Sequence, residues 1–304
     1  MRIGRYAGVT DTGRRRMRNE DSLVVRPPLF AVADGMGGAR AGEIAARLAA
    51  GALEEADAGV AGEEDVAALI EEANRRIWER SLADPATSGM GTTVTAALVD
   101  ERAGTVAFGH VGDSRAYLLR EGRLEQLSTD HSLVAELVQS GVLTPEEAER
   151  HPQRSAITRA LGTDPAVEVE VRTVTAQPGD LFVLCSDGLS VMLGDDEIAA
   201  AIEGADGEPQ AAGEALVAAA NAHGGEDNIT VVLFELVEGE PEPWPPREAL
   251  TAAPSHEPGA ATPSEPNGDV RTHGAGPGGR IASLVLIAAI VVLGALGLYW
   301  GISK

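Results

Sequence analysis

The sequence predicts an α+β fold in which two antiparallel sheets lie face to face with helices on their outer faces. Between Tyr6 and about Val237, short β-type runs mostly follow one another at spacings too small for helical crossovers. Antiparallel pairing is therefore favoured, because parallel strands need a dozen or more connecting residues. The longer helical segments come in one early pair and one late pair with strands between them, and this order suits a layer of helices on each side of two sheets.

Nine runs rich in β-branched and apolar residues are the predicted strands. They are residues 6–10, 23–26, 29–33, 92–99, 105–108, 116–119, 167–174, 181–185 and 229–236. Residues 118–124 are typical of a hairpin with its turn near Gly122. Six segments have helical periodicity, namely 41–55, 64–82, 132–139, 145–150, 196–202 and 210–222. In the second, apolar residues recur at spacings of three and four, which predicts one apolar stripe packed on a sheet.

Composition restricts the class of protein and its compartment. The formal charge of −23 argues against a nucleic-acid partner, because phosphate-backbone binding depends on clustered Lys and Arg. The single cysteine, Cys185, excludes an intrachain disulfide and, within the apolar run 181–184, is expected to be a buried, unreactive thiol. Residues 1–21 contain no apolar run that could act as a secretory signal, so we expect the N-terminal part to stay in the cytoplasm.

The sequence divides into three parts, a catalytic domain at 1–238, a linker at 239–280 and a membrane-spanning helix at 281–302. The linker contains nine of the 17 prolines and few β-branched residues, so disorder is expected, with a Pro-rich docking segment as the alternative. The last segment has no charged residue, and about 22 residues at about 1.5 Å each would span a bilayer core of about 30 Å. Tyr299 and Trp300 suit the membrane interface.

Carboxylates at strand ends are the candidate metal ligands. Asp34-Gly35 and Asp187-Gly188 follow two predicted strands, and Asp227-Asn228 precedes a third. We expect the three to meet at one sheet edge if the third strand is antiparallel to the others. Such a cluster would repel itself without cations, and oxygen ligands without nearby His or Cys pairs suit Mg²⁺ or Mn²⁺. A single Asp-Gly is more often a plain turn, as we expect for Asp206-Gly207.

Seven motifs in a fixed order resemble the metal-dependent (PPM-type, type 2C) serine/threonine protein phosphatases, and more closely their bacterial branch. The resemblance covers Tyr6 to Leu236. The motifs are Arg16-x-x-Asn19-Glu20-Asp21, Asp34-Gly35-Met36-Gly37-Gly38, Gly89-Met90-Gly91-Thr92-Thr93, Gly112-Asp113-Ser114-Arg115, Asp130-His131, Ser186-Asp187-Gly188 and Glu226-Asp227-Asn228-Ile229-Thr230. Each motif alone is weak evidence, whereas all seven in order are highly specific.

The resemblance implies an α-β-β-α sandwich and a role for each site residue. Asp34 would bridge two Mn²⁺ or Mg²⁺ ions, Asp187 and Asp227 would complete the first, and the carbonyl of Gly35 would ligate the second. Glu20 and Asp21 would lie at or just behind the second ion, partly through water. Arg16 would hold the substrate phosphate, for which a guanidinium fork is suited. Asp113 matches the ligand of a weaker third ion, and an activated water would attack phosphorus in line.

Three features depart from the family pattern or leave a role open. Met36 stands where eukaryotic relatives carry a His, so the acid that protonates the leaving group is either water or His131, unless His131 is purely structural. Val191 stands where many relatives have a further third-metal Asp, which should weaken that site. Residues 140–163 resemble the family's mobile flap, whose basic residues either meet phosphopeptides or are ordinary surface charge.

The sequence thus predicts a single-pass, membrane-anchored phosphatase of phosphoserine and phosphothreonine, with a monomeric catalytic domain facing the cytoplasm. Phosphorylated proteins are the expected partners, with a membrane Ser/Thr kinase and its substrates as the family-based expectation. Two alternatives stay open. One is a phosphatase of a small phosphate ester or of one dedicated partner, and the other is a pseudophosphatase that binds phosphoproteins at the membrane.

Overall fold

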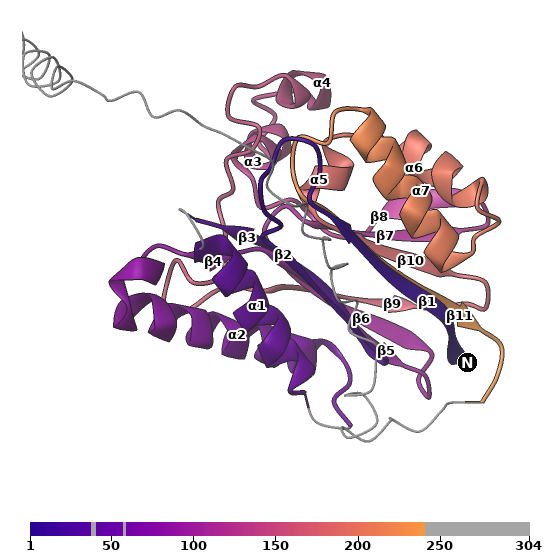
Figure 1. Cartoon of the computed structure of the whole chain (residues 1–304). Helices are drawn as coiled ribbons and strands as arrows, with labels where there is room; N and C mark the ends of the chain where they lie inside the picture. The colour runs from indigo at the N-terminus through magenta and orange to yellow at the C-terminus, as the bar shows by residue number, and fades with distance from the viewer. Residues whose placement is uncertain (38–40, 57–58, 241–304) are drawn as a thin grey trace, which may run out of the picture. The chain divides into compact units, whose positions relative to one another are not determined.

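The computed structural model describes residues 1–37, 41–56 and 59–240, and within them two antiparallel sheets form the centre of the molecule. The first sheet has the strand order β1 (Arg2–Asp11), β11 (Ile229–Val237), β10 (Leu181–Cys185), β7 (Arg115–Arg120) and β8 (Arg123–Gln126). The second has the order β2 (Asp21–Arg26), β3 (Leu29–Met36), β5 (Val94–Asp100), β6 (Thr105–Val111) and β9 (Glu170–Thr175), with β4 (Gly91–Thr92) beside β3. The sheets lie face to face (Figure 1).

The space between the sheets is filled by apolar side chains from both inner faces. The rings of Phe30 on β3 and Phe234 on β11 stack at 4.2 Å with an interplanar angle of 7°. Phe182 on β10 stacks on Phe234 from the other side at 5.1 Å. All three side chains are fully buried, and each contributes roughly 1.5–3 kcal/mol through burial of apolar surface. This core fixes the two sheets against each other.

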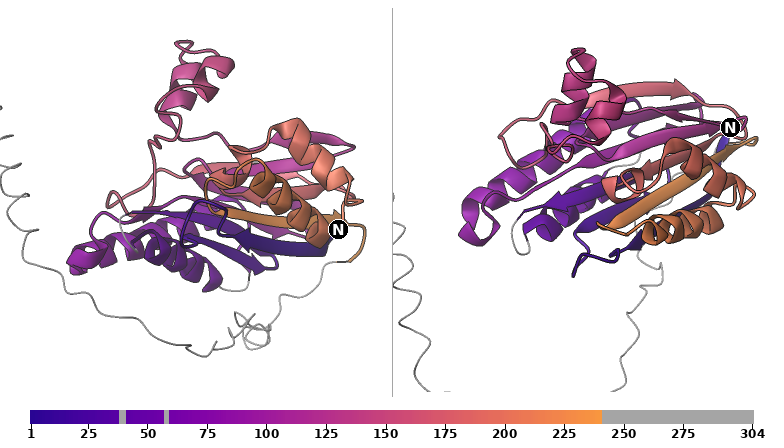
Figure 2. Two further views of the ribbon diagram at one scale, coloured as in Figure 1. Left: turned by 45° about the horizontal axis from the view of Figure 1, so that its top comes forward. Right: turned by 90° about the horizontal axis from the view of Figure 1, so that it is seen from above.

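Helices cover the outer face of each sheet (Figures 1 and 2). On the second sheet lie α1 (Ala41–Glu54) and α2 (Glu63–Ala83), and Val66, Ile70 and Ile77 of α2 form the predicted buried stripe. The buried positions of α1 are mainly alanines, whose small side chains let the helix approach β3 closely. On the first sheet lie α6 (Asp195–Glu203) and α7 (Pro209–Ala222). The predicted pairs of helices therefore form the two outer layers.

A smaller helical segment stands away from the sandwich. It consists of α3 (Leu133–Gln139) and α4 (Pro145–Glu149), and it projects from the end of the molecule at which α5 (Asp187–Ser190) lies (Figures 1 and 2). An isolated bridge between Ser132 and Ile157 closes its base. Of these two helices, α4 falls within the predicted flap at 140–163, whereas α3 precedes it.

The structure confirms the α+β class and the antiparallel sheets, and it changes three details. The predicted strand 92–99 is interrupted at Thr93 and forms β4 and β5, and the four-residue helix α5 and the short 3-10 turn Pro85–Thr87 were not predicted. The hairpin turn lies at Glu121 and Gly122, between β7 and β8, as predicted. The predicted linker at 239–280, except for its first two residues, and the predicted membrane helix at 281–302 lie outside the described residues. Within the described ranges, none of the helices is both long and apolar enough to cross a bilayer.

Candidate active site

The predicted acidic residues meet at one end of the sandwich, but they come from both sheets. Asp34 lies within β3 of the second sheet and is the cross-strand partner of Asp21, the first residue of β2. Asp187 opens α5 directly after β10, and Asp227 lies two residues before β11, both in the first sheet. The prediction that these residues share one sheet edge is therefore wrong. The face-to-face packing of two sheets brings their strand ends together instead.

Burial and mutual repulsion make these carboxylates unfavourable as free anions. Burial, followed by repulsion from Asp21 and Asp187, raises the pKa of Asp34 well above its ordinary value. Burial and the nearby Asp227 raise the pKa of Asp187. Burial and repulsion from Asp187 raise the pKa of Asp113 to about 7. These carboxylates raise one another's pKa, and a divalent cation bound among them would offset the repulsion.

Asp21 is held by hydroxyl groups of the opposite sheet. Its Oδ2 accepts hydrogen bonds from Thr230 Oγ1 at 2.6 Å and Ser186 Oγ at 2.9 Å. Burial nevertheless raises the pKa of Asp21 to about 6, and the two hydroxyl donors oppose that rise. The hydroxyl of Thr230 also lies 2.7 Å from that of Thr10 on β1. Three strands and the start of α5 therefore position this carboxylate.

The donor atoms at this site fit a hard divalent cation. The Oδ1 atoms of Asp21 and Asp187 are buried and have no hydrogen-bond partner among the described residues. The surrounding acidic groups supply only oxygen donors, the ligand type that Mg²⁺ and Mn²⁺ prefer. Within the described ranges, no three Asp, Glu, His or Cys side chains already form an enclosed metal-binding group, so ion binding requires the carboxylates to move closer together.

The other predicted site residues surround this cluster. Arg16 is half-exposed, and its Nη2 donates to Asp227 Oδ2 at 2.6 Å, so this structure pairs the predicted phosphate ligand with a predicted metal ligand. The backbone N–H of Glu20 donates to Asn228 Oδ1 at 2.8 Å. Gly35 is buried, and a Cβ there would collide with the carbonyl oxygens of Gly42 and Glu20, so only glycine lets β3 approach α1 this closely.

Both ring nitrogens of His131 already have partners, so neither is free to donate a proton to a leaving group. Its Nδ1 accepts a hydrogen bond from the backbone N–H of Gly112 at 3.1 Å, and its Nε2 lies 3.2 Å from Glu170 Oε2 and 3.4 Å from Arg159 Nη1. The backbone N–H of His131 donates to the carbonyl of Gly112 at 2.7 Å. Burial and the nearby Arg159 lower the pKa of His131. His131 thus supports the turn that presents Asp113, in agreement with the structural interpretation of this residue.

Cys185 and Met36 take no part in acid–base chemistry here. Cys185 is fully buried, and burial raises the pKa of its thiol to about 12, so it is the unreactive residue that the sequence predicts. Met36 ends β3 and offers no proton.

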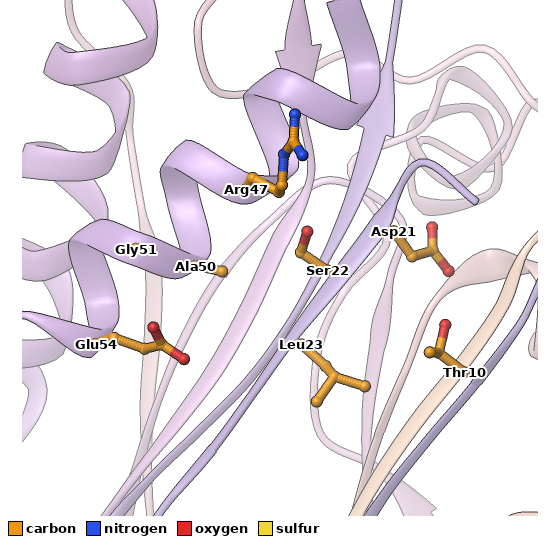
Figure 3. Close-up of a pocket in the computed structure, with 8 residues that line it drawn as sticks. All are labelled: Thr10, Asp21, Ser22, Leu23, Arg47, Ala50, Gly51 and Glu54. Carbon is orange, nitrogen blue, oxygen red and sulfur yellow. The ribbon is translucent and has the colours of Figure 1, made fainter. Parts of the chain in front are cut away.

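Two cavities adjoin the cluster. A cavity of about 890 Å³ borders Asp113 and Asp187 and runs beneath α3, with Val134, Val138 and Val191 among its lining residues. Val191 is 47% exposed, lines this cavity and lies one turn after Asp187, whose carbonyl accepts its N–H at 2.8 Å. A second cavity of about 350 Å³ lies behind Asp21, between β2 and α1 (Figure 3). There Arg47 and Glu54 project from the helix side, and Thr10 lies beside Asp21.

Sequence reasoning gave no role to several polar residues that organise the site. In the sequence, Ser186 and Thr230 stand out only as parts of motifs, yet both side chains donate to Asp21. Thr93 likewise stands out only as part of a motif. Its N–H donates to the Asp34 carbonyl at 2.9 Å, and its hydroxyl lies 2.7 Å from that of Ser114. Ser186 and Ser114 each stand next to an Asp in their motifs, a signal that could have indicated them, whereas Thr93 and Thr230 do not.

Comparison with known proteins identifies the family. The family model described as "Protein phosphatase 2C" matches residues 14–211. The chain belongs to the protein phosphatase 2C family. It is 43% identical over 240 residues to the serine/threonine protein phosphatase PstP of Mycobacterium tuberculosis, covering 77% of this chain and 45% of that relative. It is 40% identical over 238 residues to the serine/threonine phosphatase stp of Listeria monocytogenes, covering 74% of this chain and 93% of the relative.

Solved structures of protein phosphatase 2C relatives have the same fold. The catalytic domain of PstP in complex with two manganese ions superposes with a TM-score of 0.70 at 37% identity, covering 78% of this chain and 99% of that one. The chain spans about half the length of the PstP sequence that it matches, and nearly the whole of the stp sequence. The part in common with both is the two-sheet phosphatase 2C domain described above.

Proposed function

We propose that this protein hydrolyses phosphoserine and phosphothreonine in other proteins with the help of two Mn²⁺ or Mg²⁺ ions. The observation that carries the proposal is the convergence of Asp34, Asp187 and Asp113 with Asp227. Burial and repulsion raise the pKa of the first three, which calls for a divalent counter-charge. The family relationship supports the same activity, because the named relatives are serine/threonine protein phosphatases. PstP with its two manganese ions supports the choice of metal.

In this proposal each site residue has one role. Asp34, Asp187, Asp227 and the carbonyl of Gly35 would hold the two ions. Glu20 and Asp21 would support this set of ligands, and Asp113 would hold a weaker third ion. When bound, the ions supply an activated water and positive charge for the phosphoryl oxygens.

The protein's own side chains bind the substrate phosphate and position the carboxylates. Arg16, at the rim, exchanges its contact with Asp227 for the phosphate, which a planar guanidinium binds through two parallel hydrogen bonds. Ser186 and Thr230 hold Oδ2 of Asp21, which leaves its unpaired Oδ1 available to the acidic cluster. Neither Met36 nor His131 donates a proton to the leaving group, so that proton comes from water.

The proposal also places the enzyme at the cell membrane, anchored by the apolar segment 281–302 with the catalytic domain in the cytoplasm. The uncharged length of that segment, with Tyr299 and Trp300 near its end, supports the anchor. Membrane-bound phosphoproteins, including a Ser/Thr kinase and its substrates, are then the accessible partners. Deletion of 281–304 should move the protein to the soluble fraction without changing its kinetics on peptides. A deleted protein that still sediments with membranes would refute the anchor.

The activity is tested with a phosphothreonine peptide and a phosphotyrosine peptide of the same sequence. We expect Mn²⁺-dependent release of phosphate from the first, little from the second, and none after EDTA. Asp34→Asn and Asp187→Asn should each reduce kcat at least about a hundredfold, because each removes a charge that holds an ion. The control is Asp206→Asn, at an exposed turn remote from the cluster. Near-normal turnover by either site variant at saturating Mn²⁺ would refute the assignment.

A further inference from the structure

The loop between β1 and β2 concentrates positive charge on an otherwise acidic protein. Four of the 24 Lys and Arg residues, Arg14, Arg15, Arg16 and Arg18, fall within residues 13–18, which contain no acidic residue. The whole chain has a formal charge of −23. A local excess of positive charge on such a surface attracts anions and repels cations. We refer to residues 13–18 as the arginine loop.

The arginine loop is held firmly against the active site. Asn228 Nδ2 donates to the carbonyls of Thr12 at 2.9 Å and Arg18 at 2.8 Å, which closes the base of the loop. The carbonyl of Gly225 accepts from the backbone N–H groups of Arg14 at 2.7 Å and Arg15 at 3.2 Å. Gly13 has a φ of +77°, and a Cβ there would collide with the carbonyl of Asp227. The loop is therefore built onto the segment that carries Asp227.

The cations of this loop differ in what they contact. Arg16 points inward and pairs with Asp227 at 2.6 Å. Arg14, Arg15 and Arg18 are exposed, and within the part of the chain that the structure describes their guanidinium groups form no ion pair. Met17 is 97% exposed beside them. Three charges that form no ion pair and one apolar side chain thus face solvent next to the residue proposed to hold the phosphate.

We propose that the arginine loop binds anionic side chains of the phosphoprotein substrate, either carboxylates or a second phosphate, close in sequence to the residue being dephosphorylated. This inference rests on the proposed function, because it takes the phosphate at Arg16 as its reference point. Arg14, Arg15 and Arg18 each lie within two residues of Arg16, so the matching anions lie about two to four residues from the phosphoresidue in an extended peptide at about 3.3 Å per residue. Met17 provides an apolar contact between the charges.

The occupant is a substrate peptide rather than a membrane surface because the loop lies at the entrance to the catalytic cluster. Lipid headgroups bound there would compete with the phosphopeptide. The expected gain is moderate, since exposed ion pairs are individually weak. Acting together, the arginines should strengthen binding about tenfold, and added salt should reduce that gain because the Debye length is only about 8 Å at 0.15 M ionic strength.

The test uses the full chain and three labelled peptides that share one sequence. The first carries one phosphothreonine with neutral flanks, the second adds two glutamates, and the third replaces them with a second phosphothreonine. Peptide affinity is measured by fluorescence anisotropy in an Asp34→Asn background, which prevents turnover, and kcat/KM is measured in the otherwise unaltered protein. We expect the second and third peptides to bind about tenfold more tightly than the first, with a preference that weakens at high salt.

The variants separate the charge of the arginine loop from its structure. The triple substitution Arg14→Gln, Arg15→Gln, Arg18→Gln should abolish the preference while leaving kcat/KM for the first peptide within about twofold, and the corresponding Lys triple should retain most of it. The matched control replaces two exposed arginines elsewhere, Arg102→Gln and Arg123→Gln, and should change nothing.

Three outcomes would overturn the inference. In the first, the parent protein binds all three peptides with equal affinity, and in the second, the preference for the acidic peptides survives in the Gln triple variant. The third outcome is that the Gln triple variant binds the peptides as the parent does and loses only its binding to vesicles of anionic phospholipid. If no peptide is hydrolysed but the charge-dependent binding persists, the proposed catalysis fails while the binding surface stands.

Discussion

The clearest physical consequence of the acidic cluster is that it should destabilise the metal-free domain near neutral pH. Asp113 allows a quantitative test, because burial and repulsion from Asp187 raise its pKa to about 7 from an ordinary value of 3.8. Above pH 7 the carboxylate is charged in both the folded and the unfolded chain, and its charge is unfavourable only in the folded one. As the pH falls from 7 toward 4, the folded carboxyl takes up a proton first and the penalty disappears.

The magnitude follows from the shift. A difference of about three pKa units corresponds to about 4 kcal/mol at about 1.36 kcal/mol per unit. Since Asp113 is partly exposed and solvent screens its charge, we take about half, or roughly 2 kcal/mol. Asp113→Asn removes the charge with little change of shape. In EDTA it should therefore raise the free energy of unfolding by roughly 2 kcal/mol at pH 8, and Tm by about 5 °C, with the gain shrinking toward pH 4.

The assay is urea and thermal unfolding of the metal-free domain at several pH values, followed by circular dichroism. Asp206→Asn is the control and should show no such pH dependence, because Asp206 lies exposed at a turn. A stability gain that is independent of pH, or a loss of stability at pH 8, would refute the argument that charge repulsion dominates at Asp113. Saturating Mn²⁺ should remove the advantage of the variant, since bound cations offset the same repulsion.

Four further predictions concern single residues. Asp227→Asn should lower kcat at least about a hundredfold while the circular dichroism spectrum stays unchanged, because it removes a ligand charge and not a core contact. Arg16→Ala should raise KM for phosphopeptides at least about tenfold, with little change in Mn²⁺ affinity measured by calorimetry. Arg16→Lys should recover only part of the affinity for the phosphate, since an ammonium lacks the planar fork. An unchanged KM in the Ala variant would remove Arg16 from the site. Val191→Asp should shift the last rise of activity to lower Mn²⁺, and a single saturation phase that this change does not move would contradict a third site at Asp113. Phe30→Ala should cost about 3–5 kcal/mol in urea unfolding, because it leaves a cavity between the sheets.

Much of the fold could be predicted because its elements are locally encoded. The alternation of β-type runs and the 3–4 periodicity of the helix around Ile70 are properties of neighbouring residues, and the structure follows them. The four-residue helix α5 escaped prediction because Asp187-Gly188 has the composition of a turn and the helix is only one turn long. The break at Thr93 was equally hidden, since the run on both sides of it is β-type.

The structure brings the predicted acidic residues together, but not in the way that the sequence predicts. Carboxylates at strand ends indicated a metal site, but no local pattern says which strands share a sheet, so Asp34 was placed on the wrong edge. Hydroxyl partners such as Thr230 depend on how the two sheets face each other, which local sequence does not encode. The contact of Arg16 with Asp227 joins residues 211 positions apart and could not have been inferred from spacing.

The pairing of β1 with β11 has a consequence for synthesis. The first strand of the domain finds its partner only in the last one, and the cluster needs Asp21 and Asp34 from one end of the domain and Asp187 and Asp227 from the other. A chain emerging from the ribosome therefore exposes an unpaired strand edge until residue 237 has been released, and it lacks the complete set of carboxylates until then. A nascent chain that ends before Asp227 therefore cannot assemble the acidic cluster, and a chaperone that shields β1 would act during the same interval.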